Sequence, residues 1–269
     1  MVGGLGANPD NKRVTLKVTG ERIVTPSGGF NASWQRHAAC YALSARFLMG
    51  PRILDVGCGL GHAFEHLGTD ASIGLDVHHG SLMPQRRQTV AADMRRMPFS
   101  TASIDSLVCI HAIEHVPDPQ AAVAECARVL TPDGPAVVIT PNRLTFGRHD
   151  EIIDPYHFIE FDADQLETLC GREFDRVEKY GIFGSERYMR FFDEERRQLN
   201  RLLSKDPLRL RRFVPRKLRQ QLYDWKLTRA RTAEASQAAA EFTIDDFELR
   251  SHGLESALDV MTVCHRRRG

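Results

Sequence analysis

Residues 52–67, RILDVGCGLGHAFEHL, set three closely spaced glycines directly behind a short apolar run. Glycine reaches the positive φ values of a tight turn and lets the backbone approach a ligand, because it carries no Cβ. The segment therefore predicts a β-strand that ends in a ligand-binding loop before a helix. The loop reads G-x-G-x-G after Asp55, which differs from the G-x-G-x-x-G of dinucleotide-binding loops.

Short apolar runs alternate with helical segments on both sides of this loop. We expect strands at Arg52–Val56, Ser72–Asp76, Thr89–Ala92, Ser106–Ile110 and Ala136–Thr140. We expect a helix from Ser33 and further helices near 61–68, 80–87 and 119–130. Such alternation is typical of an α/β fold, doubly wound and Rossmann-like, in which helices cover both faces of a mostly parallel sheet. With two later strands, near Val177–Ile182 and Leu258–Cys264, we predict seven strands and a helical insertion before the last one.

The composition narrows the class of protein. A chain of 269 residues with 42% hydrophobic and 26% charged residues is typical of a globular protein. No apolar run approaches the ~18 residues that span a bilayer, and the first residues do not resemble a signal peptide. The six cysteines form no C-x-x-C pair, which predicts free buried thiols in a cytoplasmic protein.

Residues 109–119, CIHAIEHVPDP, contain the H-x-x-E-H order of one class of zinc peptidase. That motif needs a sustained helix to bring both imidazoles to one metal ion. Here His111 directly follows an apolar strand, and Pro117 stops any helix after about one turn. We therefore reject the peptidase hypothesis and assign no residue of this chain as a metal ligand.

Four motifs occur in an order that is typical of one enzyme family. They are Asp55 with its glycines, Asp76 at the end of SIGLDV, Asp93-Met94 after the third strand, and HAIEHV at 111–116. From about Arg52 to Phe161 the sequence resembles class I S-adenosylmethionine-dependent methyltransferases, in particular the small-molecule branch. RVLTPDGPAVVITPN resembles the family's helix–turn–strand unit, with Pro-Asp-Gly where Pro-Gly-Gly is usual. The alternative is a nucleotide-binding fold without methyl transfer.

The resemblance implies S-adenosylmethionine as the methyl donor. A carboxylate at Asp76 can accept both hydroxyls of a ribose, and Asp93 is placed to contact an adenine edge. The amino-terminal TGERIV and residues 34–37 resemble a lid segment, in which Arg22 or Arg36 would meet the donor's carboxylate; for Arg36 an ordinary covering helix is the alternative. The predicted donor-binding residues are Arg22, Trp34, Asp55, Gly57, Cys58, Gly59, Gly61, Asp76, Val77, Asp93, Met94, His111 and Ala112.

Methyl transfer to oxygen requires the acceptor to lose a proton, and histidine is a natural proton acceptor. His115 is the first candidate, and packing against the donor is its alternative role. The loop after the fifth strand adds Asp154, Tyr156 and His157 as an acid–base or metal-binding cluster, with His149 and Asp150 nearby. A structural role for His157, closing the loop onto Phe158 and Phe161, is the alternative.

The same loop resembles the Pro-Asn-Arg…Pro-Phe/Tyr-His…Phe segment of actinobacterial O-methyltransferases that act on sugars and polysaccharides. Some members of that group use Mg²⁺, which would suit carboxylate ligands here. The resemblance therefore implies Mg²⁺ as an optional second cofactor, although no ligand spacing in the loop is diagnostic.

Residues 186–232 carry fifteen Lys or Arg and six Asp or Glu, a net charge of +9. Amphipathic helices are expected around Tyr188, Phe191 and Phe192 and around Leu218, Leu222 and Trp225, broken at Pro207 and Pro215. We interpret this insertion as a cap over the substrate mouth or a dimer surface. Its charge permits an anionic substrate, a membrane surface or nucleic acid. No RNA-binding module or aromatic–basic platform accompanies it, which disfavours nucleic acid.

These patterns predict four regions. Residues 1–50 form a lid segment and helix, 51–185 the donor-binding core, 186–240 the basic helical cap or oligomerisation insertion, and 241–269 the final strand. The predicted function is O-methylation of a sugar, glycan or glycosylated small metabolite, with a homodimer as the expected assembly. Methylation of RNA or another anionic polymer, or donor binding without catalysis, are the alternatives.

Overall fold

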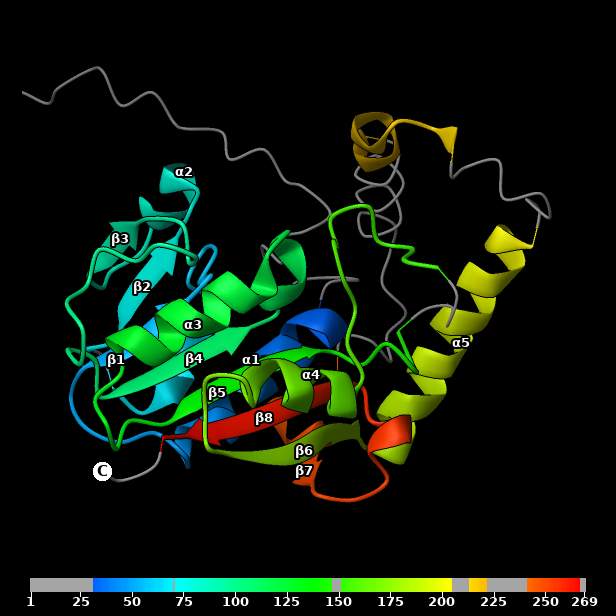
Figure 1. The fold of residues 1–269 in the computed structure, drawn as a ribbon. Helices are drawn as coiled ribbons and strands as arrows, with labels where there is room; N and C mark the ends of the chain where they lie inside the picture. Colours follow the sequence, from blue (N-terminus) through cyan, green and yellow to red (C-terminus); the bar gives the residue numbers. More distant parts are fainter. Residues whose placement is uncertain (1–30, 70, 147–150, 205–212, 222–240, 267–269) are drawn as a thin grey trace, which may run out of the picture.

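The computed structural model describes residues 31–69, 71–146, 151–204, 213–221 and 241–266 (Figure 1). Within these ranges one sheet has the strand order β3-β2-β1-β4-β5-β8-β6-β7. Strands β1 to β5 are parallel, whereas β8 is antiparallel to β5, and β6 is antiparallel to β7 and β8. The strands are β1 (Ile53–Val56), β2 (Ile73–Asp76), β3 (Thr89–Ala91), β4 (Ser106–Ile110), β5 (Ala136–Pro141), β6 (Arg176–Gly184), β7 (Phe247–Arg250) and β8 (Asp259–His265).

Helices cover both faces of this sheet. Figure 1 shows α3 and α4 on one face and α1 on the other. Each face has its own buried apolar cluster. One includes Ala122 of α3 and Leu166 of α4, and the other includes Ala38 and Tyr41 of α1. The α/β doubly wound prediction is therefore confirmed. The α-helices are α1 (Asn31–Ala45), α2 (His79–Leu82), α3 (Pro119–Val129), α4 (Ala163–Cys170) and α5 (Glu186–Leu203), and the short 3-10 helices are η2 (Phe64–Leu67), η3 (Ile113–His115), η5 (Ile244–Asp246) and η6 (Leu254–Ser256).

The first five strands lie within one residue of their predicted bounds at each end. Strand β4 is buried along its whole length, because β1 and β5 flank it and helices cover both faces. The sheet has one strand more than the seven predicted. The additional strand, β7, lies at the edge of the sheet next to β6. Its residues alternate in burial and give no continuous apolar run.

Two predicted helices are shorter than expected. The segment 61–68 forms a single 3-10 turn between Ala63 and Gly68, which both have positive φ. The segment 80–87 forms α2, and the chain then leaves the helix, which lets Gln85 donate to the Gly59 carbonyl at 2.9 Å. The helix predicted from Ser33 begins two residues earlier, at Asn31. The side-chain amide of Asn31 donates to the Phe242 carbonyl at 3.0 Å.

The insertion begins with α5, which extends away from the sheet in Figure 1. Its first turn is anchored by Tyr188, which is 3% exposed and packs on the rings of Phe242 and Phe247. Residues 216–221 are also helical and follow Pro215. The predicted apolar positions Leu222 and Trp225, and the break at Pro207, lie outside the described residues. Among the helices described here, none combines the length and apolarity that crossing a membrane requires.

A buried ion pair fixes the start of the glycine loop. Asp55, at the end of β1, is fully buried and lies 2.6 Å from Nη2 of Arg87. Nη1 of Arg87 donates to Ser72 at 2.8 Å, and the hydroxyl of Tyr41 donates to Asp55 at 3.1 Å. Burial raises the pKa of Asp55, although Arg87 and Tyr41 stabilise its charge. The pair joins α1, β1 and the segment before β3 beneath the loop.

Replacing Arg87 by Met leaves the Asp55 carboxylate buried without its cation. We expect the free energy of unfolding to fall by about 3–5 kcal/mol, measured by urea unfolding at pH 7. Arg52→Met is the matched control, because the Arg52–Asp105 pair has an Arg side chain that is 53% exposed and is screened by solvent. Equal losses in the two variants would contradict the importance of the buried pair.

Candidate functional site

A cavity of about 260 Å³ lies where the chain leaves β1, β2, β3 and β4. Because parallel strands end at one edge of the sheet, the four sequence motifs meet there. The lining residues are Gly57, Gly59, Leu75, Asp76, Val77, His78, Ala92, Asp93, Met94, Arg95, His111, Ala112, His115, Val116 and Pro117.

The glycine loop forms one wall of the cavity. Gly57 and Gly59 both have positive φ, at 75° and 54°. A Cβ at Gly57 would lie 2.3 Å from the Cβ of Ala112, so only glycine lets the loop pack against the segment after β4. A Cβ at Gly59 would meet no atom within 4 Å. The backbone of Gly59 is therefore open on the side where a ligand can approach.

Two carboxylates face the cavity from the next strands. Asp76 accepts a hydrogen bond from the Gly59 amide at 2.9 Å and one from the His78 amide at 2.8 Å. These bonds fix the carboxylate at the cavity rim, between the glycine loop and β2. Asp93 lies 2.6 Å from Arg95, whose hydrogen bonds lower the pKa of Asp93.

Several predicted donor-binding residues support the cavity from outside its lining. Asp55 lies beneath the glycine loop, where it forms the buried ion pair with Arg87. Cys58 is buried, which raises the pKa of its thiol to about 12, and Gly61 packs against Gln85. Trp34 packs on the ring of His62, with centroids 4.3 Å apart. Arg22 lies outside the described residues.

Six lining residues were not among the site residues predicted from the sequence. Each lies within two positions of a predicted site residue, so adjacency to the motifs was the available signal. They are Leu75, His78, Ala92, Arg95, Val116 and Pro117.

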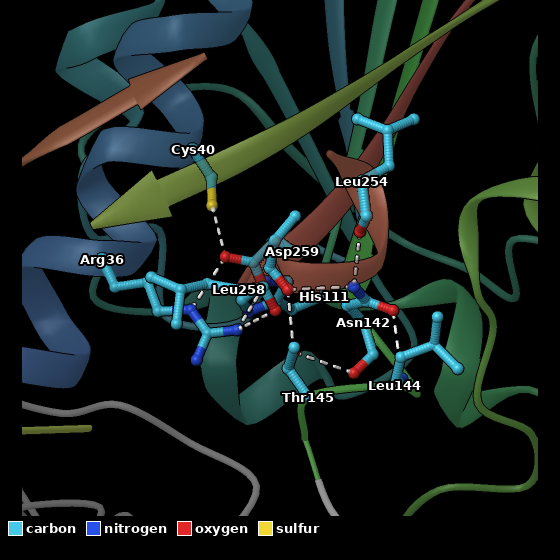
Figure 2. Close-up of polar contacts among 10 residues, drawn as sticks. Arg36, Cys40, His111, Asn142, Leu144, Thr145, Leu254, Leu258 and Asp259 are labelled. Atoms are coloured by element: carbon cyan, nitrogen blue, oxygen red, sulfur yellow. Dashed lines mark hydrogen bonds and ion pairs between the residues drawn. The ribbon is translucent and has the colours of Figure 1, made fainter. Parts of the chain in front are cut away.

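Asp259, at the start of β8, is the centre of a buried network of polar contacts. Figure 2 shows Arg36 from α1 and Asp259 facing each other, with Asp259 also in contact with His111. Nε and Nη2 of Arg36 lie 2.8 Å and 2.5 Å from the two oxygens of Asp259, and Nη2 also donates to the Leu258 carbonyl at 2.8 Å. Burial opposes the charge of Asp259, but Arg36 and His111 outweigh it and hold its pKa well below the usual value.

This network engages one candidate from the sequence and adds one residue. Arg36 is 9% exposed and its guanidinium binds Asp259, which favours its alternative role in an ordinary covering helix. Asp259 itself was missed, because an aspartate at the start of an apolar strand gives no local signal of a partner 148 residues away. Asn142 and Thr145 hold the preceding turn through the Ala257 carbonyl, as Figure 2 shows in part.

His111 combines a strained backbone with an oriented side chain. Its φ is 47°, a left-handed value that is uncommon for histidine and is concentrated at functional sites. Its Nε2 lies 2.9 Å from Asp259, an ionised acceptor. The bond therefore requires a proton on Nε2. In the singly protonated imidazole, Nδ1 has the lone pair that can accept a proton.

Two further histidines pack behind His111. The rings of His37 and His62 are 4.4 Å apart, and those of His37 and His111 are 5.2 Å apart. Burial, followed by the charge of His111, lowers the pKa of His62 to about 4. Burial also lowers the pKa of His37 well below the usual value. Both imidazoles are therefore neutral at pH 7.

The loop after β5 folds onto η3 and brings His157 to His115. The amide of Phe158 donates to the Glu114 carbonyl at 2.8 Å, and the two imidazole rings are 4.9 Å apart. His115 lines the cavity, whereas His157 and Asp154 lie beside it and are each 8% exposed. Burial opposes protonation of His157, but Glu160, Glu114 and Asp154 more than offset it and raise the pKa of His157.

Known proteins share this fold and parts of this sequence. Residues 54–138 match a family model described as a methyltransferase domain. The chain is 34% identical over 187 residues to a probable S-adenosylmethionine-dependent methyltransferase of Mycolicibacterium smegmatis, covering 65% of this chain and 72% of the relative. It is 36% identical over 117 residues to a ubiquinone biosynthesis O-methyltransferase of Xanthomonas oryzae, covering 38% of this chain and 48% of that relative.

A solved structure agrees with the fold. An S-adenosylmethionine-dependent methyltransferase of Thermotoga maritima, described as a possible histamine N-methyltransferase, matches with a TM-score of 0.57 at 15% identity. The match covers 87% of this chain and 92% of that chain. The chain belongs to the class I S-adenosylmethionine-dependent methyltransferases. It is a methyltransferase, and its family implies S-adenosylmethionine as the methyl donor.

The low pKa of His62 predicts acid sensitivity of the fold. An unfolded histidine titrates near pH 6.5, so the unfolded chain binds more protons than the folded chain between pH 6.5 and 4. We expect the free energy of unfolding to fall with decreasing pH in this window, by up to about 1.4 kcal/mol per pH unit from His62. His62→Leu should flatten this slope in urea unfolding between pH 7 and 4.5. An unchanged slope would contradict the assignment.

Proposed function

We propose that the chain transfers a methyl group to a hydroxyl oxygen of a sugar, glycan or glycosylated small metabolite. The observation that carries the proposal is the His111–Asp259 pair at the wall of the donor cavity. An alcohol must lose its proton as it is methylated, so it needs an oriented base more than an amine does. The O-methyltransferase of Xanthomonas oryzae among the relatives supports an oxygen acceptor.

The lining of the cavity fits the donor. We propose that Asp76 holds the ribose hydroxyls, that Asp93 and Met94 contact the adenine, and that the open backbone of Gly59 lies against the donor's amino-acid part. Bound S-adenosylmethionine supplies an electrophilic methyl group on a sulfonium. The residues of the chain act mainly by position, because orientation alone corresponds to effective molarities of ~10⁵–10⁸ M.

His111 is the better placed base. His115, the first candidate from the sequence, also lines the cavity, but its Nδ1 lies 3.4 Å from the Tyr156 carbonyl. Asp259 fixes the tautomer of His111 and stabilises the imidazolium that forms when it takes a proton. We propose that His111 accepts the proton of the hydroxyl group and that His115 contacts the acceptor.

Contacts between the basic insertion and the loop after β5 support an acceptor site beside that loop. Arg216 donates to the carbonyls of Pro155 and Tyr156 at 2.8 Å and 3.0 Å, and its guanidinium lies over the ring of Phe158. The insertion therefore contacts the loop that carries His157. We propose that the described parts of the insertion, residues 186–204 and 213–221, belong to a cap over the acceptor, whereas the homodimer stays a prediction.

Asp76→Ala removes the proposed ribose carboxylate. We expect calorimetric titration with S-adenosylhomocysteine, in the presence of EDTA, to give at least tenfold weaker binding than in the wild type. Glu65→Ala, an exposed carboxylate on η2, is the matched control and should bind normally. Equal affinities of Asp76→Ala and wild type would place the ribose elsewhere.

His111→Gln removes the proposed base. With radiolabelled donor and a panel of methyl glycosides and oligosaccharides, we expect kcat to fall by roughly 10²–10⁴-fold. A phenolic acceptor, which loses its proton more easily, should show a smaller loss. His252→Gln, an exposed histidine, is the control. Methylation of RNA in place of every glycoside, or an unchanged kcat, would contradict the proposal.

A further inference from the structure

We propose that Glu114, His115 and His157 bind a divalent transition-metal ion beside the donor cavity, and that this ion holds an oxygen of the acceptor. Each residue offers one ligand atom, and these atoms lie within 4.8 Å of one another. We infer the metal site from the positions of these three residues alone. Its role toward the acceptor rests on the proposed function.

Glu114 carries a buried carboxylate. The residue is 1% exposed, and neither carboxylate oxygen has a hydrogen-bond partner in the described structure. A buried carboxylate is normally paired, hydrogen-bonded or bound to a metal ion. The two neighbouring imidazoles are the other ligands that such an ion would require.

A buried carboxylate holds the imidazole of His157. Its Nδ1 lies 3.2 Å from Glu160, whose side chain is 4% exposed. This contact leaves Nε2 as the nitrogen available for a ligand. A carboxylate behind the distal nitrogen of a histidine is the usual support of a metal-ligating imidazole, because it fixes the tautomer and increases the basicity of the ligand.

The donor set selects the kind of metal. Mg²⁺ prefers oxygen ligands, whereas imidazole favours ions such as Zn²⁺, Co²⁺, Ni²⁺ and Fe²⁺. Two imidazoles and one carboxylate therefore suit a zinc-like ion better than the Mg²⁺ that the sequence resemblance implies. Three protein ligands also leave positions open for water or for an acceptor hydroxyl.

The arrangement differs from the zinc-peptidase motif that the sequence contains. Glu114 and His115 are consecutive residues of the 3-10 turn η3, and His157 comes from the loop after β5. His111 of the H-x-x-E-H order is bound to Asp259 instead. The absence of a sustained helix after His111 confirms the rejection of the peptidase motif.

A second trio within the described residues shows why the first one is favoured. Cys40, His111 and Asp259 are equally close to one another, but Arg36 already neutralises Asp259. Burial also raises the pKa of the Cys40 thiol well above its usual value, so it carries no charge to bind a cation. The unpaired carboxylate lies only in the Glu114 trio. His115 lines the donor cavity, so an ion there borders the cavity.

The test titrates the chelator-stripped full chain with Co²⁺ alone, without donor or acceptor, and follows the visible absorption of the bound ion. We expect one equivalent to bind to the wild type. Glu114→Gln and His157→Gln should each weaken binding at least tenfold, and Glu160→Gln should weaken it less. His62→Gln, which changes a buried imidazole of the neighbouring cluster, is the matched control and should retain the affinity.

Thermal unfolding separates metal binding from a structural role of Glu114. At Co²⁺ concentrations of roughly 100 times Kd the wild type should gain a few degrees in Tm, and Glu114→Gln should gain none. The metal-free variant should unfold no earlier than the metal-free wild type, because the carboxylate that the substitution removes has no hydrogen-bond partner among the described residues. Absence of saturable binding, or binding that survives both ligand substitutions and is lost in His62→Gln, would overturn the site.

The role toward the acceptor has its own test. If the ion holds the acceptor, EDTA should abolish glycoside methylation while S-adenosylhomocysteine still binds. Methylation that is insensitive to EDTA would overturn this role. The Co²⁺ titration involves neither donor nor acceptor, so a failure of the proposed O-methylation leaves its outcome unchanged.

Discussion

The position of β1 between β2 and β4 is the constraint on which the rest of the structure depends. All three strands are parallel, so the glycine loop, Asp76 and His111 leave the sheet at one edge and enclose one cavity. Two buried ion pairs then fix segments at this edge: Asp55 with Arg87 holds the glycine loop, and Asp259 with Arg36 holds His111.

Three buried carboxylates at this edge differ in how their charge is balanced. Asp55 is paired with an arginine and a tyrosine, and Asp259 with an arginine and a histidine. Glu114 is as deeply buried, and among the described residues no hydrogen-bond donor reaches its oxygens. This difference separates carboxylates that organise the fold from the one that we assign to an ion.

The sequence predicted those parts of the molecule that short apolar runs determine. The first five strands appear where expected because they are buried between neighbours, and the motif residues follow at their ends. The helices near 61–68 and 80–87 are shorter because Gln85 and Arg87 turn back to the glycine loop, which no local pattern reveals. The contacts of His111 with Asp259 and of His115 with His157 join distant segments, so the sequence indicated His111, His115 and His157 but neither Asp259 nor these pairings.

A crystal structure grown with S-adenosylhomocysteine and Zn²⁺, with diffraction measured on both sides of the zinc absorption edge, tests the central claim most directly. We expect the ribose at Asp76, the homocysteine part against Gly59, and one anomalous peak between Glu114, His115 and His157. The ligand bound outside this cavity, or an anomalous peak at other residues with none at this trio, would contradict this claim.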